Sequence, residues 1–111
     1  DKCTKNYWNI AEQLYNAGKN KFRYKGNHVW EYNNSGEWKK DKNNKELSKY
    51  ISNELYESLM SRVLYWQSIN QNDDYEINYR IIMMLEIATI LKNKNHLKDI
   101  LKEAKEFFVV D

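Results

Sequence analysis

The sequence contains no proline and only three glycines, all of them in its first third. Proline and glycine are the residues that interrupt helices most strongly. After Gly18, Gly26 and Gly36 the chain has no such breaker, so long helices are permitted from about residue 44 onward.

Cysteine and long apolar runs are also scarce. The one cysteine, Cys3, cannot form an internal disulfide, and it lies far in sequence from His28 and His96, so no zinc site is expected. No apolar run approaches the roughly 20 residues that a membrane-spanning helix needs, and the chain does not start with a signal-peptide pattern. We therefore predict a reduced, intracellular protein with no membrane contact.

Motifs that place catalytic groups on a defined local structure are missing as well. The sequence has no phosphate-binding P-loop, no GxGxxG, no HExxH, no CxxC and no EF-hand spacing. His28 could act as a general base only with a partner, and Glu31 alone lies near it in sequence, so we expect His28 on the face of a sheet. The chain is predicted to have no enzymatic activity, no metal and no cofactor of its own.

The size and composition fit one globular domain, spanning residues 1–111. The chain has a mass of 13.5 kDa, with 41% hydrophobic and 31% charged residues. Its mean hydropathy of -0.94 is low mainly because Asn and Lys are abundant. Since the chain begins at Asp1 without Met and stops at Asp111 directly after an apolar stretch, we interpret it as a piece of a longer polypeptide.

Hydrophobic periodicity changes near residue 43. Alternating aromatic and polar residues predict an antiparallel hairpin or three-stranded sheet over residues 20–41. Helical spacing predicts four helices, over residues 4–17, 44–67, 74–92 and 95–108. The fold class is therefore α+β and mainly helical, with about four helices around a small antiparallel aromatic hairpin.

The expected boundaries follow from local signals. Polar capping residues predict helix starts at Thr4, Asn43, Asp73 and Asn95. Gly18 is expected to end the first helix in a left-handed conformation. In the last helix, Lys98, Lys102 and Lys105 are expected to face solvent.

Aromatic residues dominate the predicted hairpin. Residues 33–36 form a turn, after which Trp38 is expected across from Trp30 or Tyr32. We expect Trp30 and Trp38 to be the contribution of the hairpin to the core.

Positive charge is concentrated in this same segment. Residues 19–45 hold eight basic and three acidic residues, a net charge of +5, whereas the remainder holds 10 basic and 13 acidic residues, a net charge of -3. Lysines beside aromatic rings are typical of single-strand binding surfaces. The DNA-binding candidates are Lys21, Arg23, Lys25, Trp30, Trp38, Lys39, Lys40 and Lys42. In the other interpretation, which we favour for Trp30 and Trp38, these aromatics belong to the core and the lysines form its solvated rim.

The predicted helix over residues 74–92 is apolar on more than one side. Ile82, Met83 and Met84 are consecutive, so they cannot all face one core. This helix lies either in the centre of a bundle or against a neighbouring molecule.

The order of elements resembles that of a known family. The resemblance rests on the segments Phe22-Arg23-Tyr24, Val29-Trp30-Glu31-Tyr32 with Trp38 after a turn, a helix opening at residues 46–55, and a helix ending at residues 102–108. This arrangement resembles the domain that directly precedes the superfamily-3 helicase module in primase-helicases of poxviruses, mimiviruses, related large DNA viruses and some phages. The resemblance covers nearly the whole chain.

The resemblance implies a parent protein with an N-terminal primase, this connecting domain and a C-terminal ATPase that assembles as a homo-hexamer and unwinds DNA. ATP and Mg would belong to that helicase, whose ATP-binding residues lie outside this chain. The parent would act at the site of viral DNA replication in the host cell, and this domain would contact single-stranded DNA and the neighbouring primase and helicase domains. The alternatives are a protein-interaction or ring-assembly domain without nucleic-acid contact and, less favoured, an independent small enzyme.

Overall fold

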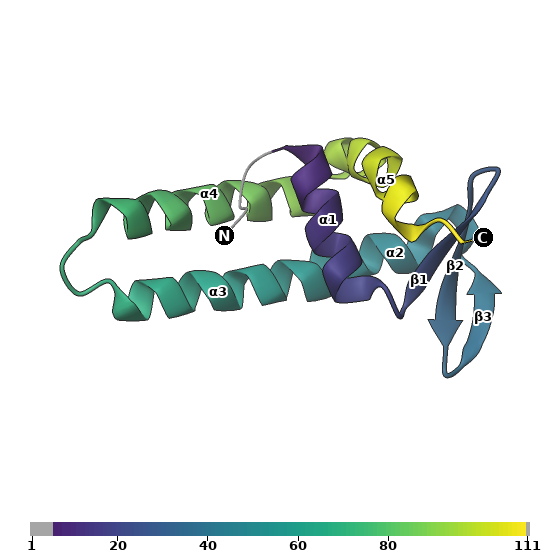
Figure 1. Ribbon diagram of the computed structural model, residues 1–111, viewed down its shortest axis with the longest axis horizontal. Helices are drawn as coiled ribbons and strands as arrows, with labels where there is room; N and C mark the ends of the chain where they lie inside the picture. Colours follow the sequence, from purple (N-terminus) through teal and green to yellow (C-terminus); the bar gives the residue numbers. More distant parts are fainter. Residues whose placement is uncertain (1–5, 111) are drawn as a thin grey trace.

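A computed structural model describes residues 6–110 and confirms the mainly helical α+β fold (Figure 1). In chain order the elements are α1 (Tyr7–Gly18), β1 (Phe22–Gly26), β2 (Val29–Asn34), β3 (Glu37–Lys40), the 3-10 turn η1 (Lys42–Asn44), α2 (Lys45–Lys49), the π-helical η2 (Tyr50–Leu55), α3 (Tyr56–Ile69), α4 (Tyr75–Lys92) and α5 (Lys94–Phe108). The backbone stays helical from α2 through η2 to α3, so these three segments form the single helix predicted over residues 44–67.

The three strands form an antiparallel meander in the order β1-β2-β3. Two-residue turns join them at Asn27–His28 and Ser35–Gly36, and all four residues have positive φ values. This is the geometry of type I′ turns, whose twist matches that of the flanking strands. The turn predicted over residues 33–36 is present, whereas His28 lies in the first turn and not on a sheet face.

The two faces of the sheet differ in burial. Phe22, Tyr24 and Trp30 point toward the helices and are at most 9% exposed, and Tyr24 pairs with Trp30 across the strands. Trp38 is opposite Asn33, one position beyond Tyr32 and three beyond Trp30, the two expected partners. Because side chains alternate between faces, this register puts Trp38 on the face away from the helices.

The π-helical segment η2 follows from the spacing of the apolar residues. Leu47, Ile51, Leu55, Leu59 and Val63 repeat every four residues, and all are buried. An α-helix turns about 100° per residue, so a strict four-residue repeat drifts around the helix by about 40° at each step. The wider i→i+5 turn of η2 counteracts this drift and keeps the whole stripe on the core.

The start of α2 is capped from outside the helix. Asn43, the expected cap, adopts a left-handed φ of 58° and makes no side-chain cap. Instead the buried carboxylate of Asp41 accepts hydrogen bonds from the backbone N–H groups of Glu46 at 2.8 Å and Leu47 at 2.9 Å. The amide of Asp41 also donates to the Trp30 carbonyl, so one residue connects the sheet to the helix.

The other helix boundaries differ slightly from the predicted ones. Asp74 and Asn93 cap α4 and α5, in place of the expected Asp73 and Asn95. The expected start at Thr4 lies outside the described residues, among which Asn6 caps α1. Gly18 is not left-handed but remains within α1, where the rings of Phe22 and Tyr50 approach within 3.4 and 3.5 Å of the position that a Cβ would occupy.

The molecule is elongated, with extents of 49 × 26 × 24 Å. Figure 1 shows α3 and α4 as an antiparallel helical hairpin that projects from a body made of α1, α5, α2 and the sheet. In the body, Phe108 packs against Trp30 and Tyr15 at centroid distances of 5.4 and 5.0 Å. Val109 continues along the free edge of β1, where Val110 donates to the Tyr24 carbonyl. No helix within residues 6–110 is long and apolar enough to span a membrane.

Substituting Asp41 tests the cap that connects the sheet to the helix. Asp41→Ala should lower the free energy of unfolding by about 2 to 3 kcal/mol, because it leaves buried N–H groups without an acceptor. Asp74→Ala removes an exposed cap and should cost only about 1 kcal/mol. Urea denaturation followed by circular dichroism measures both values, and equal losses would contradict the special role of Asp41.

Candidate nucleic-acid interface

The face of the sheet that points away from the helices carries a basic and aromatic surface. Arg23 and Lys25 come from β1, and Trp38 and Lys40 come from β3. Strand alternation places Arg23, Trp38 and Lys40 opposite the buried Phe22, Tyr24 and Trp30 side. Lys25 lies exposed at the register irregularity between Tyr24 and Gly26. We call these four residues the outer sheet surface.

Arg23 is held in the middle of this surface. Its guanidinium lies over the Trp38 ring, 4.3 Å from the centroid, and its Nε donates a 2.6 Å hydrogen bond to Glu31 Oε1. The side chains of Arg23 and Glu31 are 29% and 19% exposed. The Glu31 carboxylate therefore offsets part of the Arg23 charge, while the stacking fixes the Trp38 ring. Lys25, two residues along β1, and Lys40, across β2, remain exposed.

Lys21 points elsewhere. Its ammonium is 3.1 Å from Glu54 Oε2 and lies 5.0 Å from the centre of the Tyr50 ring. The hydrogen bond to Glu54 raises the pKa of Lys21, and burial raises the pKa of Tyr50. Lys21 thus connects β1 to η2 and is not part of the outer sheet surface.

The other residues predicted to bind DNA, Trp30, Lys39 and Lys42, also lie away from the outer sheet surface. Trp30 is 2% exposed and contacts the rings of Tyr24 and Phe108, so its ring is not accessible to a base. This is the core position expected for it. Lys39 is opposite Tyr32 on the other face, and Lys42 is exposed in η1. Trp38, which was also expected in the core, is only half-buried because it lies on the face that no helix covers.

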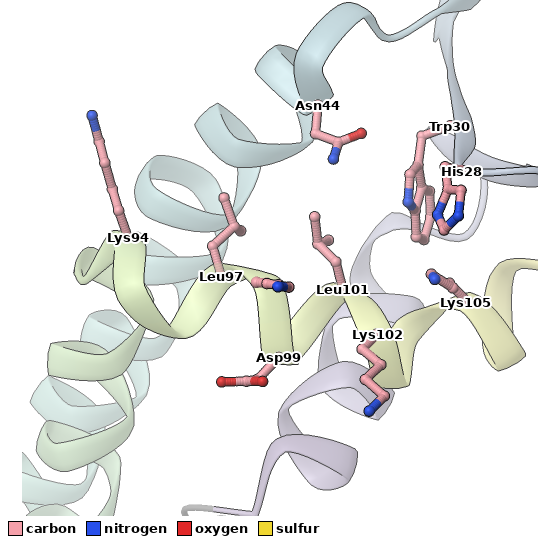
Figure 2. Close-up of a pocket in the computed structure, with 10 residues that line it drawn as sticks. His28, Trp30, Asn44, Lys94, Leu97, Asp99, Leu101, Lys102 and Lys105 are labelled. Carbon is pink, nitrogen blue, oxygen red and sulfur yellow. The ribbon is translucent and has the colours of Figure 1, made fainter.

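Sequence reasoning missed a second basic feature, a groove of about 710 Å³ between α5, η1 and the start of β2 (Figure 2). Its lining includes four lysines of α5, which we call the lysine row: Lys94, Lys98, Lys102 and Lys105. The i, i+4, i+8 spacing of the first three was visible in the sequence. The sequence did not show the opposite wall of the groove, because His28, Trp30 and Asn44 provide it from distant parts of the chain.

Within residues 6–110 no three His, Cys, Asp or Glu side chains are grouped so that they could hold a metal ion. His96 is half-buried and bonds to the Tyr7 hydroxyl through Nδ1.

In comparisons of this chain with protein-family models, with curated proteins and with solved structures, nothing matches.

The two tryptophans of the sheet should respond differently to truncation. Trp30→Ala removes a core ring and should lower the free energy of unfolding by about 3 to 5 kcal/mol. Trp38→Ala loses only the stacking on Arg23 and should cost about 1 kcal/mol. Urea denaturation measured by circular dichroism distinguishes them, and comparable losses would show that Trp38 is part of the core.

Proposed function

We propose that this chain is a non-catalytic accessory domain of a viral DNA-replication primase-helicase, and that it contacts single-stranded DNA through the outer sheet surface. In this proposal the domain links a primase to a ring-forming, ATP-dependent helicase. ATP, Mg and the unwinding activity belong to those neighbouring parts.

The observation that supports DNA contact is the composition of the outer sheet surface. Lys25 and Lys40 are exposed cations near an arginine that holds a tryptophan ring in place. Phosphates pair with such cations, and bases stack on such aromatic and guanidinium planes. The link to primase-helicases is supported by the sequence resemblance alone.

Charge reversal on the sheet tests this proposal. A labelled oligonucleotide of about 12 nucleotides should bind the chain with a log-log salt slope of about -2, since single strands contribute roughly -0.7 for each of up to three phosphate contacts that Arg23, Lys25 and Lys40 can make. Lys25→Glu with Lys40→Glu should weaken binding about tenfold or more in fluorescence anisotropy.

Lys19→Glu with Lys49→Glu is the matched control, because it makes the same change in net charge at exposed lysines away from this surface. The control should change affinity less than twofold. Equal effects of the two pairs would mean that only net charge matters, and a salt-independent signal would contradict phosphate contact.

A second function, assembly with other protein chains, is favoured by the projecting hairpin. Tyr75, Tyr79 and Ile82 are 81%, 56% and 54% exposed, and their spacing of four and three residues puts them in one stripe of α4. Contiguous apolar surface of this kind marks interaction sites. In this alternative the domain supports ring assembly and has no nucleic-acid contact.

Sedimentation equilibrium over micromolar concentrations tests assembly through α4. If the stripe joins copies of this chain, the average mass should rise with concentration, and Tyr79→Lys with Ile82→Lys should return it to that of a monomer. Both positions are exposed, so the far-UV spectrum should not change. A monomer at every concentration would remove self-assembly of this domain as its function.

A further inference from the structure

The charges of α5 are sorted around its axis. At about 100° per residue the lysine row spans about 80° of the helix, while Asp99, Glu103 and Glu106 fall within about 60° on another side. Ile100, Ala104 and Phe108 occupy the third side and are buried. The helix therefore presents one cationic side, one anionic side and one core side.

The cationic side borders the groove seen in Figure 2. Leu97 and Leu101 point from α5 toward Asn44 and form an apolar floor, and Lys105 lies beneath His28 and Trp30. The volume of about 710 Å³ is in the range of small-molecule and cofactor sites. The groove is thus large enough to hold several linked groups of a ligand.

The electrostatics of the groove favour an anion. Four lysines line it with one acidic residue, Asp99, and Figure 2 shows the Lys105 side chain below His28, whereas the Lys102 and Asp99 side chains point away from the cavity. Among the described residues none of the four lysines makes a salt bridge, and Lys105 lies 5.7 Å from the centre of the Tyr24 ring. A bound phosphate would therefore not have to displace a protein carboxylate from any of them.

The shape of the cationic side favours a chain of phosphates over a single ion. Residues four apart on a helix are separated by about 6 Å along its axis, so the backbone positions of Lys94, Lys98 and Lys102 are regularly spaced along one side of α5. The leucine floor can cover sugars and bases. At one end His28 is exposed and held in the type I′ turn, where its ring is available to a base.

We propose that this groove binds the phosphate backbone of single-stranded nucleic acid along the lysine row, with one base against His28. The inference rests on the proposed nucleic-acid function but uses a different surface. Lys25 of the outer sheet surface lies two residues before the turn that carries His28, so a strand leaving the groove at this turn would meet the sheet next.

The experiment compares variants of the groove and of the sheet in the 111-residue chain, using the same 12-nucleotide probe. Lys94→Glu with Lys98→Glu should weaken binding at least tenfold and make the salt slope shallower by about 1.4, which is two contacts at roughly 0.7 each. Both lysines are exposed, and Lys94→Gln with Lys98→Gln gives a milder second pair if charge reversal affects folding. The pair Lys19→Glu with Lys49→Glu again serves as the control.

The base contact needs a separate variant. His28→Asn keeps a residue that tolerates the positive φ of this turn but removes the ring, so it should weaken binding about fivefold without changing the salt slope. An unchanged affinity would overturn the assignment of a base to His28.

The outcomes separate this inference from the function proposed above. If only Lys25→Glu with Lys40→Glu loses binding, the groove proposal is overturned and the sheet proposal stands. If only Lys94→Glu with Lys98→Glu loses binding, the groove proposal stands and the sheet proposal is overturned. No binding by the unmodified chain overturns both. Tripolyphosphate is the competing probe: if it displaces the oligonucleotide at equal total phosphate, the groove takes free phosphate chains, and the nucleic-acid assignment fails.

Discussion

The buried carboxylate of Asp41 is the interaction on which the relation between sheet and helices depends. Its backbone N–H donates to Trp30 in the sheet, and its two carboxylate oxygens accept from the first turn of α2. Asp41 is 4% exposed, and a buried carboxylate is costly unless hydrogen-bond donors satisfy it. Here the donors are backbone N–H groups of another element, α2. The end of β3 and the start of the long helix are therefore held in one geometry.

That geometry also places the walls of the groove. Trp30, whose carbonyl receives the Asp41 amide, packs its ring against Phe108 of α5. Asn44 follows in η1, only three residues after Asp41. The side of α5 that carries the lysine row thus borders Asn44 and the β1–β2 turn. The aromatic contacts and the cap together bring residues from three separate parts of the chain around one cavity.

Much of the fold could be predicted because periodicity is a local property. The switch from period 2 to helical spacing near residue 43 located the sheet and the long helices, and the missing prolines and glycines allowed those helices to be long. The caps were less predictable. Asp73 and Asp74 are both good caps by type, and only the backbone path decides which one meets the first N–H groups of α4. Asp41 acts across an intervening turn, which short-range capping patterns do not describe.

The sequence by itself determined the element types, the aromatic character of the sheet and the excess of positive charge around it. Tertiary structure alone decided which of these residues share a surface. Trp30 and Trp38 look alike in sequence, yet register and the covering helices bury one and leave the other beside Arg23. Lys21 is adjacent in sequence to the β1 cations but pairs with Glu54, and the lysines of α5 meet His28 across more than sixty residues. Such contacts depend on packing between distant segments, which local patterns of charge and polarity do not encode.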